Sequence, residues 1–459
     1  MKKIIIIRHA ESEGNYRHII QGGEEDYGLT EQGNKLCKQR AEEMETQLES
    51  CTHIMCSPTK RAYQTAELIK KTTNLPCIIK QIDLLKEVDA GILSGHTHQE
   101  AKVFFPKEYK VWIERKDLNE IKNAEKGSQL QARVLAFLVQ YFQNEEYDDL
   151  IVSHAGFIRS FINTIQAVSR ENQINIPNCE YFIMNDVWKK INYKIIKENS
   201  KGLILYVRTI DAQYIIKRYN RLLDDFELEL DKIQNRVQAV QNNIPEVYFS
   251  GNVETATGHK YGVRVYSYLE GNHKYGELGQ KKIIDLIKNI ENLSREYNKY
   301  NITKSYDEHN LFFKFENTKY NYTNNKLKNL REMILKEPRY SYLKKQKVQI
   351  LTLYDLHRDN ILFYENDIMF IDMGSIIWAP TVFQIAVVVV ETFMLYSVKE
   401  GLVCLNYYLE TEKCSLEDIK LCMLIRVFMG ISFFENNKIN GKEKYLEMYW
   451  YAYNFIANN

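Results

Sequence analysis

The segment KIIIIRHAESEGN, residues 3–15, decides the fold of the first third of this 459-residue chain. Its run Lys3–Ile7 is β-branched, which is typical of a buried strand in a parallel sheet. Strand-like and helix-like segments then alternate. We predict a helix over Thr30–Leu48 capped by Thr30, a strand over His53–Cys56, a helix over Pro58–Lys71 and a strand over Leu150–Val152. This order predicts an α/β domain with a mostly parallel sheet.

Basic and imidazole side chains follow several of these strands. Arg8 and His9 come directly after the first strand, and His154 follows the strand at Leu150–Val152. Arg61 lies near the start of the helix that follows His53–Cys56. Because ligands bind beyond the carboxyl ends of strands in an open α/β sheet, we expect these four side chains to share one site.

These residue types suit phosphoryl transfer. Two guanidinium groups can hold a phosphate by paired hydrogen bonds, and a helix N-terminus adds further donors. A neutral imidazole, His9, can attack phosphorus in line, and a second one, His154, can donate to the oxygens as charge develops. An acid must protonate the leaving oxygen. Glu87 is the candidate, with Asp89 as a minor alternative.

Several motifs in order resemble one known family. They are RHAESEGN (8–15), QG (21–22), LTEQG (29–33), CSPTKRAYQTA (56–66), LKEVDAGILSGHTHQE (85–100) and VSHAGF (152–157). Residues 1–185 resemble the histidine phosphatase superfamily, so the resemblance implies a three-layer, phosphoglycerate-mutase-like α/β domain. It implies that His9 is the nucleophile, that Glu87 is the proton donor, and that Arg8, Arg61 and His154 form the phosphate pocket. Asn15 and Gln21 match polar positions that line that pocket in the family.

The same resemblance implies hydrolysis of a small phosphomonoester without a cofactor. A mutase is the main rival, but mutases carry a longer basic insertion after the acid, and the segment 99–129 is only modestly basic. Ala10 stands where glycine is commoner. His96 and His98 could suggest a metal site. No third ligand is suitably spaced, so we interpret both as loop residues, and His53 as an ordinary histidine.

The pattern changes after about residue 195, which predicts domains over 1–195 and 196–459. Strands are expected at Leu203–Thr209, Tyr214–Tyr219, Val247–Ser250 and Val263–Leu269, with a helix over Leu222–Gln241. The remainder is mainly helical around a hairpin at Ile361–Asp372. This hairpin begins after an Asp355-x₄-Asn360 motif and ends at Asp372. Asp355 can orient a substrate hydroxyl while Asn360 and Asp372 hold Mg²⁺ on nucleotide phosphates.

The motifs DLHRDNILF (355–363), FIDMG (370–374) and VYSYLEG (265–271) resemble the aminoglycoside phosphotransferase and choline kinase family. The resemblance implies a two-lobed, protein-kinase-like α+β domain that uses ATP and Mg²⁺. It would phosphorylate a hydroxyl of a small molecule: a hydroxylated amine, an amino sugar or an aminoglycoside-like compound. Lys217 should bind the nucleotide phosphates and pair with Glu229, or alternatively Glu227.

Two departures from that family favour an alternative. Leu353-Tyr354 replaces the usual His-Gly pair, and no glycine-rich loop lies between Leu203 and Gln213. The second domain could therefore be a non-catalytic nucleotide sensor that regulates the phosphatase. A protein substrate ranks lower for either half, because no peptide-groove pattern is visible.

Composition limits the partners. Lys plus Arg is 61 and Asp plus Glu is 60, a net charge of +1 that gives no support for nucleic-acid or membrane partners. The eight cysteines form no Cys-x-x-Cys pair and no signal peptide is visible, so we expect a cytoplasmic protein with reduced thiols. The apolar stretch Phe383–Val398 contains Glu391 and is too short for a membrane span, which predicts a buried helix. Oligomeric state and substrate identity are left open.

Overall fold

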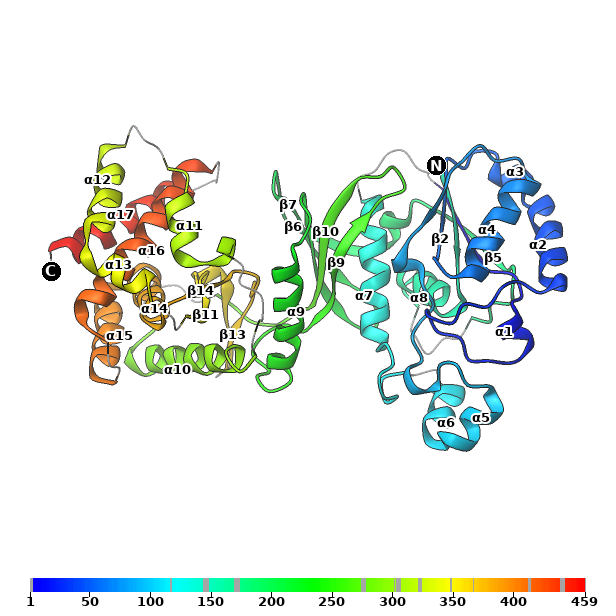
Figure 1. The fold of residues 1–459 in the computed structure, drawn as a ribbon, viewed down its shortest axis with the longest axis horizontal. Coiled ribbons are helices and arrows are strands. Elements are labelled where there is room, and N and C mark those ends of the chain that lie inside the picture. Colours follow the sequence, from blue (N-terminus) through cyan, green and yellow to red (C-terminus); the bar gives the residue numbers. More distant parts are fainter. Residues whose placement is uncertain are drawn as a thin grey trace. The chain divides into compact units, whose positions relative to one another are not determined.

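The chain forms two compact units. The first comprises Met1–Asp224 with Val247–Tyr268, and the second comprises Asp225–Glu246 with Leu269–Asn459. This is a computed structural model, and it describes residues 3–115, 118–142, 148–168, 174–273, 278–300, 302, 307–320, 324–346, 349–365, 367–411, 414–437 and 442–458. Figure 1 shows the elements of each unit.

The first unit is built on a five-stranded sheet with the order β3-β2-β4-β1-β5. Its strands are β1 (Lys3–Arg8), β2 (His53–Cys56), β3 (Ile79–Gln81), β4 (Asp148–Ser153) and β5 (Tyr181–Asn185). Strands β3, β2, β4 and β1 are parallel and β5 is antiparallel. The predicted mostly parallel sheet is confirmed, as are the three strands that the sequence indicated.

Helices cover both faces of this sheet (Figure 1). Ile5 and Ile7 of β1 pack in a cluster with α2 (Glu31–Glu43), α3 (Glu45–Leu48) and α4 (Lys60–Thr72). Ile4 and Ile6 point to the other face, toward α7 (Gly127–Leu138) and α8 (Ala155–Gln166). All four isoleucines have no exposed surface. This alternation follows from the two-residue period of a strand and makes the three layers.

Two predicted helices differ in their bounds. The helix expected over Thr30–Leu48 is interrupted at Met44, and the second helix begins at Lys60 rather than at Pro58. The cap at Thr30 is confirmed, because its Oγ1 accepts a hydrogen bond from the backbone N–H of Gly33 at 2.9 Å. A Cβ on Gly33 would lie 2.3 Å from the carbonyl oxygen of Glu11. The LTEQG motif therefore packs directly against the loop that carries His9.

Short elements connect the strands and long helices of this unit. They are α1 (Glu13–Tyr16), η1 (Asp83–Leu85), η2 (Gly91–Leu93), α5 (His98–Phe104), α6 (Pro106–Arg115), η3 (Val139–Tyr141) and η4 (Val187–Lys190). Helices α5 and α6 project as a pair (Figure 1). A small apolar cluster that includes Leu93, Ala101 and Leu118 lies in this part of the unit.

A second, antiparallel sheet completes the first unit, with the order β6-β7-β8-β10-β9. Its strands are β6 (Asn192–Asn199), β7 (Gly202–Arg208), β8 (Gln213–Tyr219), β9 (Val247–Glu254) and β10 (Lys260–Ser267). Four of them were predicted within a few residues, whereas the exposed strand β6 was not.

This second sheet shares a core with the phosphatase-like layers. Leu205, Tyr214 and Val263 belong to the same buried cluster as Phe137 of α7 and Phe157 of α8. All eight α7 residues from 131 to 138 are buried except Arg133, which is half-buried, because α7 packs between the two sheets. This sheet, which was expected to begin a separate domain at residue 196, therefore belongs to the first compact unit. The predicted division between residues 195 and 196 stays a prediction.

The second unit is mainly helical. Its helices are α9 (Asp225–Gln238), α10 (Gln280–Tyr297), η5 (Asp307–His309), α11 (Leu311–Asn317), α12 (Asn325–Lys336), α13 (Pro338–Lys344), η6 (Arg358–Asn360), α14 (Thr381–Leu395), α15 (Val398–Thr411), α16 (Leu416–Asn436) and α17 (Lys442–Asn458). Strand β11 (Ile350–Leu353) pairs with β14 (Ile376–Ala379), and β12 (Ile361–Tyr364) pairs with β13 (Asp367–Phe370), which confirms the predicted hairpin.

The buried helix predicted at Phe383–Val398 is confirmed as α14. Residues Val382–Val390 of α14 are all less than 10% exposed. Within the described ranges, no helix combines the length and the apolar content that a membrane span needs.

Candidate active site

His9 lies directly beyond the carboxyl end of β1, and its side chain is 3% exposed. Its Nδ1 lies 2.7 Å from the carbonyl oxygen of Ala10, an acceptor, so Nδ1 carries the proton and Nε2 has a free lone pair. Burial, followed by the charges of Arg61 and Arg8, holds the pKa of His9 well below its usual range. The imidazole is therefore neutral at physiological pH and has the tautomer that a nucleophilic Nε2 needs.

Arg8 and Arg61 are brought to this nucleophile by β1 and by the first turn of α4. The Nη1 of Arg8 donates to the Ile176 carbonyl at 2.7 Å, and the Nη2 of Arg61 donates to the Gly22 carbonyl at 2.9 Å. The buried Nε of each guanidinium has no hydrogen-bond partner among the described residues. Backbone carbonyls thus fix both groups while leaving donors for a ligand.

His154 follows β4, the neighbour of β1, and is completely buried. Its ring centroid lies 4.9 Å from that of His9. Its Nε2 is 3.3 Å from Oγ1 of Thr59, and its Nδ1 has no partner in the part of the chain that is described. Burial and the neighbouring cation Arg61 keep its pKa well below the usual range. The four predicted side chains are therefore brought together.

These residues lie at the base of a cavity of about 960 Å³ in the first unit. The cavity is lined by Arg8, His9, Asn15, Gln21, Arg61 and Glu87, among others, while His154 packs against His9. The predicted polar positions Asn15 and Gln21 are oriented by Ser12. Its hydroxyl is 3.1 Å from Asn15 Oδ1 and 3.2 Å from Gln21 Oε1.

Glu87 lies at the N-terminus of α8 and lines the same cavity as Arg8 and Arg61. Its carboxylate accepts hydrogen bonds from the backbone N–H groups of Gly156 and Phe157, both at 3.2 Å, and of Val88 at 2.9 Å. A Cβ on Gly156 would lie 2.5 Å from Glu87 Oε1, so the glycine leaves room for this carboxylate.

Asp89, the alternative acid, is exposed and is engaged elsewhere. Its Oδ1 accepts hydrogen bonds from the Gly91 N–H at 2.8 Å and from the Ser94 hydroxyl at 3.4 Å. It does not belong to the cavity lining. The geometry therefore favours Glu87 as the acid.

Three functional candidates were missed from the sequence. Arg159 lines the cavity, one turn beyond Ala155 on α8, and the four-residue spacing after Ala155 could have indicated it. Asn178 donates from Nδ2 to the His9 carbonyl at 2.9 Å and holds the nucleophile's backbone. Asp211, in the turn between β7 and β8, also lines the cavity, and no local pattern indicated it.

The other histidines considered in the sequence differ in their positions. His98, expected to be a loop residue, begins α5 and lines the cavity, whereas His96 and His53 do not line it. His98 Nδ1 is 3.1 Å from the Tyr109 hydroxyl and its ring is 5.3 Å from that of Trp112. The ring of His96 packs against Phe105 at 5.3 Å. His53 pairs with Asp149 at the opposite edge of the sheet.

In the second unit, the hairpin brings Asp355, Asn360 and Asp372 to one end. Asn360 is 6% exposed, and its Nδ2 donates to the Asp355 carbonyl at 2.9 Å. Its own carbonyl accepts from the N–H of Ile371 at 2.9 Å, which places Asp372 beside it. Asp372 has a left-handed φ of 59°, so this backbone is bent where the carboxylate is presented.

Tyr354, which departs from the expected family motif, is part of the core below this loop. The guanidinium carbon of Arg426 lies 5.0 Å from the centre of its ring. Arg426 in turn forms a buried ion pair with Glu391 at 2.5 Å. An aromatic–cation stack thus supports the residue that precedes Asp355.

Lys217 belongs to the first unit and is 8% exposed on β8. Its Nζ lies 5.4 Å from the centre of the Tyr266 ring on β10. In the second unit, Glu227 of α9 is 6% exposed and Glu229, the first choice as its partner, is partly exposed. Burial therefore distinguishes Glu227, and the pairing with Lys217 stays a prediction.

Known proteins are similar to the part of the chain that carries the first of these sites. Residues 4–188 match the family profile described as histidine phosphatase superfamily (branch 1). Phosphoserine phosphatase 1 of Hydrogenobacter thermophilus is 34% identical over 192 residues, which are 40% of this chain and 87% of that protein. Phosphoglycerate mutase-like protein 4 of Arabidopsis thaliana is 26% identical, over 37% of this chain and 73% of its own length.

A solved structure gives a similar alignment. Phosphoserine phosphatase from Entamoeba histolytica, in complex with 3-phosphoglyceric acid, has 23% identity and a TM-score of 0.34, over 40% of this chain and 90% of that one.

Proposed function

We propose that residues 4–188 hydrolyse a small phosphomonoester through a phosphohistidine at position 9. The premise is that the chain belongs, through these residues, to the histidine phosphatase superfamily (branch 1). In the first step the Nε2 of His9 attacks phosphorus, the N–P bond forms and the ester P–O bond breaks. Glu87, in its acid form, gives its proton to the leaving oxygen. In the second step water attacks phosphorus, a P–O bond forms, the N–P bond breaks and its electron pair returns to Nε2, while the Glu87 carboxylate takes a proton from that water and inorganic phosphate leaves.

One observation carries this proposal. A neutral imidazole with a free Nε2 is surrounded by three buried nitrogens that have no protein partner in the described ranges: Arg8 Nε, Arg61 Nε and His154 Nδ1. Leaving a buried donor unpaired costs roughly 1–3 kcal/mol, so the arrangement is explained by an anion that accepts from these groups. Such donors stabilise a phosphoryl group as its charge moves to the equatorial oxygens.

Trapping the phosphorylated protein tests this mechanism. Rapid quenching of the full chain with a ³²P-labelled phosphomonoester should yield an acid-labile, base-stable phosphoprotein. We expect His9→Ala to abolish both labelling and turnover. His18→Asn is a matched control, because His18 is exposed and its positive φ of 54° suits asparagine. Labelling that persists in His9→Ala would contradict the assignment of the nucleophile.

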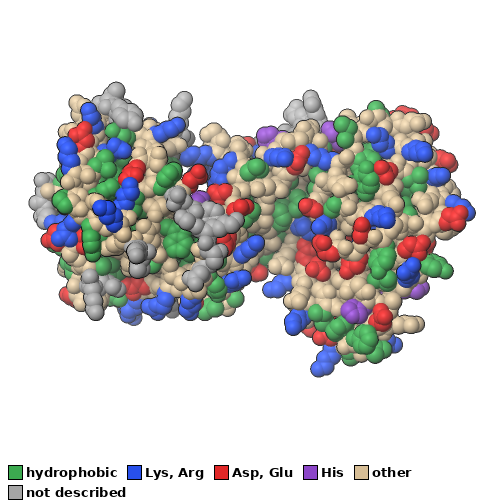
Figure 2. Space-filling view, viewed as in Figure 1, with side chains coloured by type: hydrophobic (Ala, Val, Ile, Leu, Met, Phe, Trp, Pro, Cys, Tyr) green, Lys and Arg blue, Asp and Glu red, His purple; other side chains and the backbone are tan. Residues whose placement is uncertain are grey.

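We also propose that the substrate carries an amine. The lining of the same cavity also includes the carboxylates of Glu114 and Asp211 and the indole of Trp112. These side chains come from α6 and from the turn between β7 and β8, not from the segments that carry Arg8 and Arg61. Acidic side chains also gather on the visible face just above the α5–α6 pair (Figure 2). Carboxylates and an aromatic face favour an ammonium group over a neutral or anionic one.

Two substrates that differ only at this group give a direct test. Phosphoserine has an ammonium group where 3-phosphoglycerate has a hydroxyl, and the two are otherwise the same. We expect a higher kcat/KM for phosphoserine, and we expect Asp211→Asn to reduce that preference while leaving hydrolysis of 4-nitrophenyl phosphate unchanged. Equal kcat/KM for both substrates would contradict the amine, but not the phosphohistidine mechanism.

A second function is favoured by the loop and hairpin at 355–372. We propose that residues 196–459 transfer the γ-phosphoryl group of ATP, with Mg²⁺, to a hydroxyl of a small amine-bearing molecule. The buried contact between Asn360 and the Asp355 carbonyl, and the adjacent Asp372, support this. Asn360 and Asp372 would hold the metal, Asp355 would accept the hydroxyl proton, and Lys217 would bind phosphates.

ATP consumption separates a kinase from a sensor. The full chain is incubated with Mg·ATP and a panel of hydroxylated amines and amino sugars, and ADP is measured. We expect turnover with at least one compound and its loss in Asp355→Asn. If nucleotide binds with no turnover on any compound, and ATP instead changes the phosphatase rate, the regulatory alternative is correct.

A further inference from the structure

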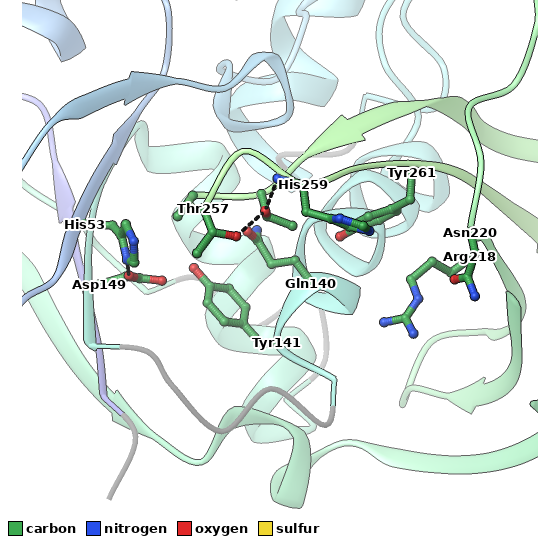
Figure 3. Close-up of a pocket in the computed structure, with 11 residues that line it drawn as sticks. His53, Gln140, Tyr141, Asp149, Arg218, Asn220, Thr257, His259 and Tyr261 are labelled. Atoms are coloured by element: carbon green, nitrogen blue, oxygen red, sulfur yellow. Dashed lines mark hydrogen bonds and ion pairs between the residues drawn. The ribbon is translucent and has the colours of Figure 1, made fainter. Parts of the chain in front are cut away.

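A second cavity, of about 290 Å³, lies at the opposite edge of the first unit's parallel sheet. One wall comes from the phosphatase layers, through His53 at the start of β2, Asp149 near the start of β4, and Gln140 and Tyr141 of η3. The other wall comes from the antiparallel sheet, through the end of β8 and the turn between β9 and β10. Figure 3 shows side chains of both walls around one hollow.

The alternation of β8 explains why this cavity holds an arginine. Tyr214 and Ile216 point into the core shared with α7, and Arg218 follows on the same face by the two-residue period. Lys217 points to the other face. The guanidinium of Arg218 therefore lies against the layers of the parallel sheet, where its one hydrogen bond to a described residue, the Val139 carbonyl, is long at 3.5 Å. A guanidinium has five N–H donors, so most of its capacity is available to a ligand.

Tyr261 is the second observation that points to a ligand. Its side chain is 3% exposed, yet its hydroxyl has no hydrogen-bond partner among the described residues. In Figure 3 its ring reaches into the hollow from behind His259. Burial raises the pKa of Tyr261, so the hydroxyl keeps its proton and can act as a donor. A buried tyrosine hydroxyl normally finds a partner, and a bound acceptor would supply one.

The charges of the lining favour an anion. Among the described lining residues, Asp149 is the one carboxylate, and it is engaged by His53 Nδ1 at 3.0 Å and by the Tyr141 hydroxyl. Among the described residues Arg218 has no carboxylate partner; its guanidinium carbon lies 5.9 Å from the centre of the Tyr261 ring, and His259 lines the same cavity. Hydroxyl donors complete the lining, since Thr255 and Thr257 contact each other at 2.9 Å at the tip of the β9–β10 turn.

The turn that closes this cavity is fixed in place. Lys80 of β3 forms an ion pair with Glu254 at 2.6 Å and donates to the Thr255 carbonyl at 2.6 Å. The backbone of Thr255 also bonds to that of His259 at 2.8 Å. Protein contacts therefore hold the walls of the cavity, and binding requires little ordering of them.

We propose that this cavity is a binding site for a small phosphate-bearing anion, held by Arg218 and the Tyr261 hydroxyl and separate from the catalytic cavity. Asp149 and His154 are five residues apart on and after β4, so the two sites lie about 16 Å apart along the sheet. The cavity volume is close to the lower end of small-ligand sites, which suits free phosphate or a compact phosphorylated metabolite.

Counting bound phosphate tests the proposal. The full chain is titrated calorimetrically with inorganic phosphate, beside Arg218→Gln and, as a matched control, Arg221→Gln. Arg221 is exposed, lies two residues after the end of β8 and does not line the cavity. We expect Arg218→Gln to bind one phosphate fewer per chain than the unmodified protein, and Arg221→Gln to bind the same number. This difference of one bound phosphate between the unmodified protein and Arg218→Gln does not depend on whether the catalytic cavity also binds phosphate. The test can therefore fail or succeed independently of the proposed hydrolysis.

A second variant and a second ligand test the proposed site further. Tyr261→Phe removes a single hydroxyl and should weaken the affected site about tenfold. Propylphosphonate, whose P–C bond a phosphatase cannot hydrolyse, should occupy the same site, and tighter binding than phosphate would identify a substituted ligand. Equal stoichiometry in all variants, together with unchanged affinity in Tyr261→Phe, would overturn the proposal.

Discussion

His154 should make the stability of the phosphatase domain, residues 4–188, fall as the pH drops below neutrality. The ring is completely buried beside Arg61 and His9, and burial is the main cause of its lowered pKa. In the folded chain it stays neutral well below pH 6.5, whereas in the unfolded chain it gains a proton near that value. The unfolded state therefore binds more protons, and the free energy of unfolding decreases as the pH falls.

The magnitude follows from this linkage. For an unfolded pKa of about 6.5 and a folded pKa far below it, lowering the pH from 7 to 5.5 removes about 1.2 kcal/mol through His154. His154→Gln has no proton to gain, so it should not show this part of the loss. The free-energy gap between the unmodified protein and the variant should thus shrink by about 1.2 kcal/mol over that interval.

Urea unfolding at pH 7.0, 6.5, 6.0 and 5.5 measures this gap. The transition to follow is the one that inorganic phosphate moves to higher urea, because binding stabilises the part that binds. Other titrating groups contribute equally to both proteins and cancel in the difference. If the two stabilities change in parallel with pH, His154 is not held neutral by burial, and the account of a neutral imidazole pair at the site is wrong.

Three further predictions address the site. Gly156→Ala places a methyl group against Glu87, so we expect kcat to fall about tenfold to a hundredfold, more for substrates with poor leaving groups than for 4-nitrophenyl phosphate; equal losses would contradict Glu87 as the acid. Asn178→Ala removes the hydrogen bond to the His9 carbonyl and should lower the phosphorylation rate about tenfold in rapid-quench measurements, and an unchanged rate would refute a positioning role. Asp355→Asn should abolish ATP turnover and leave phosphatase activity intact, whereas loss of both would show that the two sites are coupled.

The grouping of site residues at the carboxyl edge of the first sheet could be predicted, because most of these residues directly follow a strand. Parallel strands deliver the residues that follow them to one edge, so Arg8, His9 and His154 could be grouped from sequence alone. Arg61 could be added because a helix start follows the neighbouring strand. Local patterns were sufficient here since each side chain lies within a few residues of an element's end.

The missed residues depend on packing between distant segments. Asn178 reaches the His9 carbonyl from 169 positions away, and Asp211 enters the cavity only because the antiparallel sheet packs on α7. No periodicity in either segment indicates those contacts. The domain division was predicted from the change in sequence pattern near residue 195. That change marks the start of an antiparallel sheet, but it does not reveal that this sheet packs on α7.

The position of α7 between two sheets also limits how the chain can be cut. A fragment ending at residue 195 would lack Leu205, Tyr214 and Val263, and the apolar side of α7 that they cover would meet water. Such a fragment should precipitate or need detergent, although it contains every residue of the proposed hydrolytic centre. Anyone seeking the hydrolase alone should therefore keep the full chain and remove the proposed kinase activity by a substitution such as Asp355→Asn rather than by truncation.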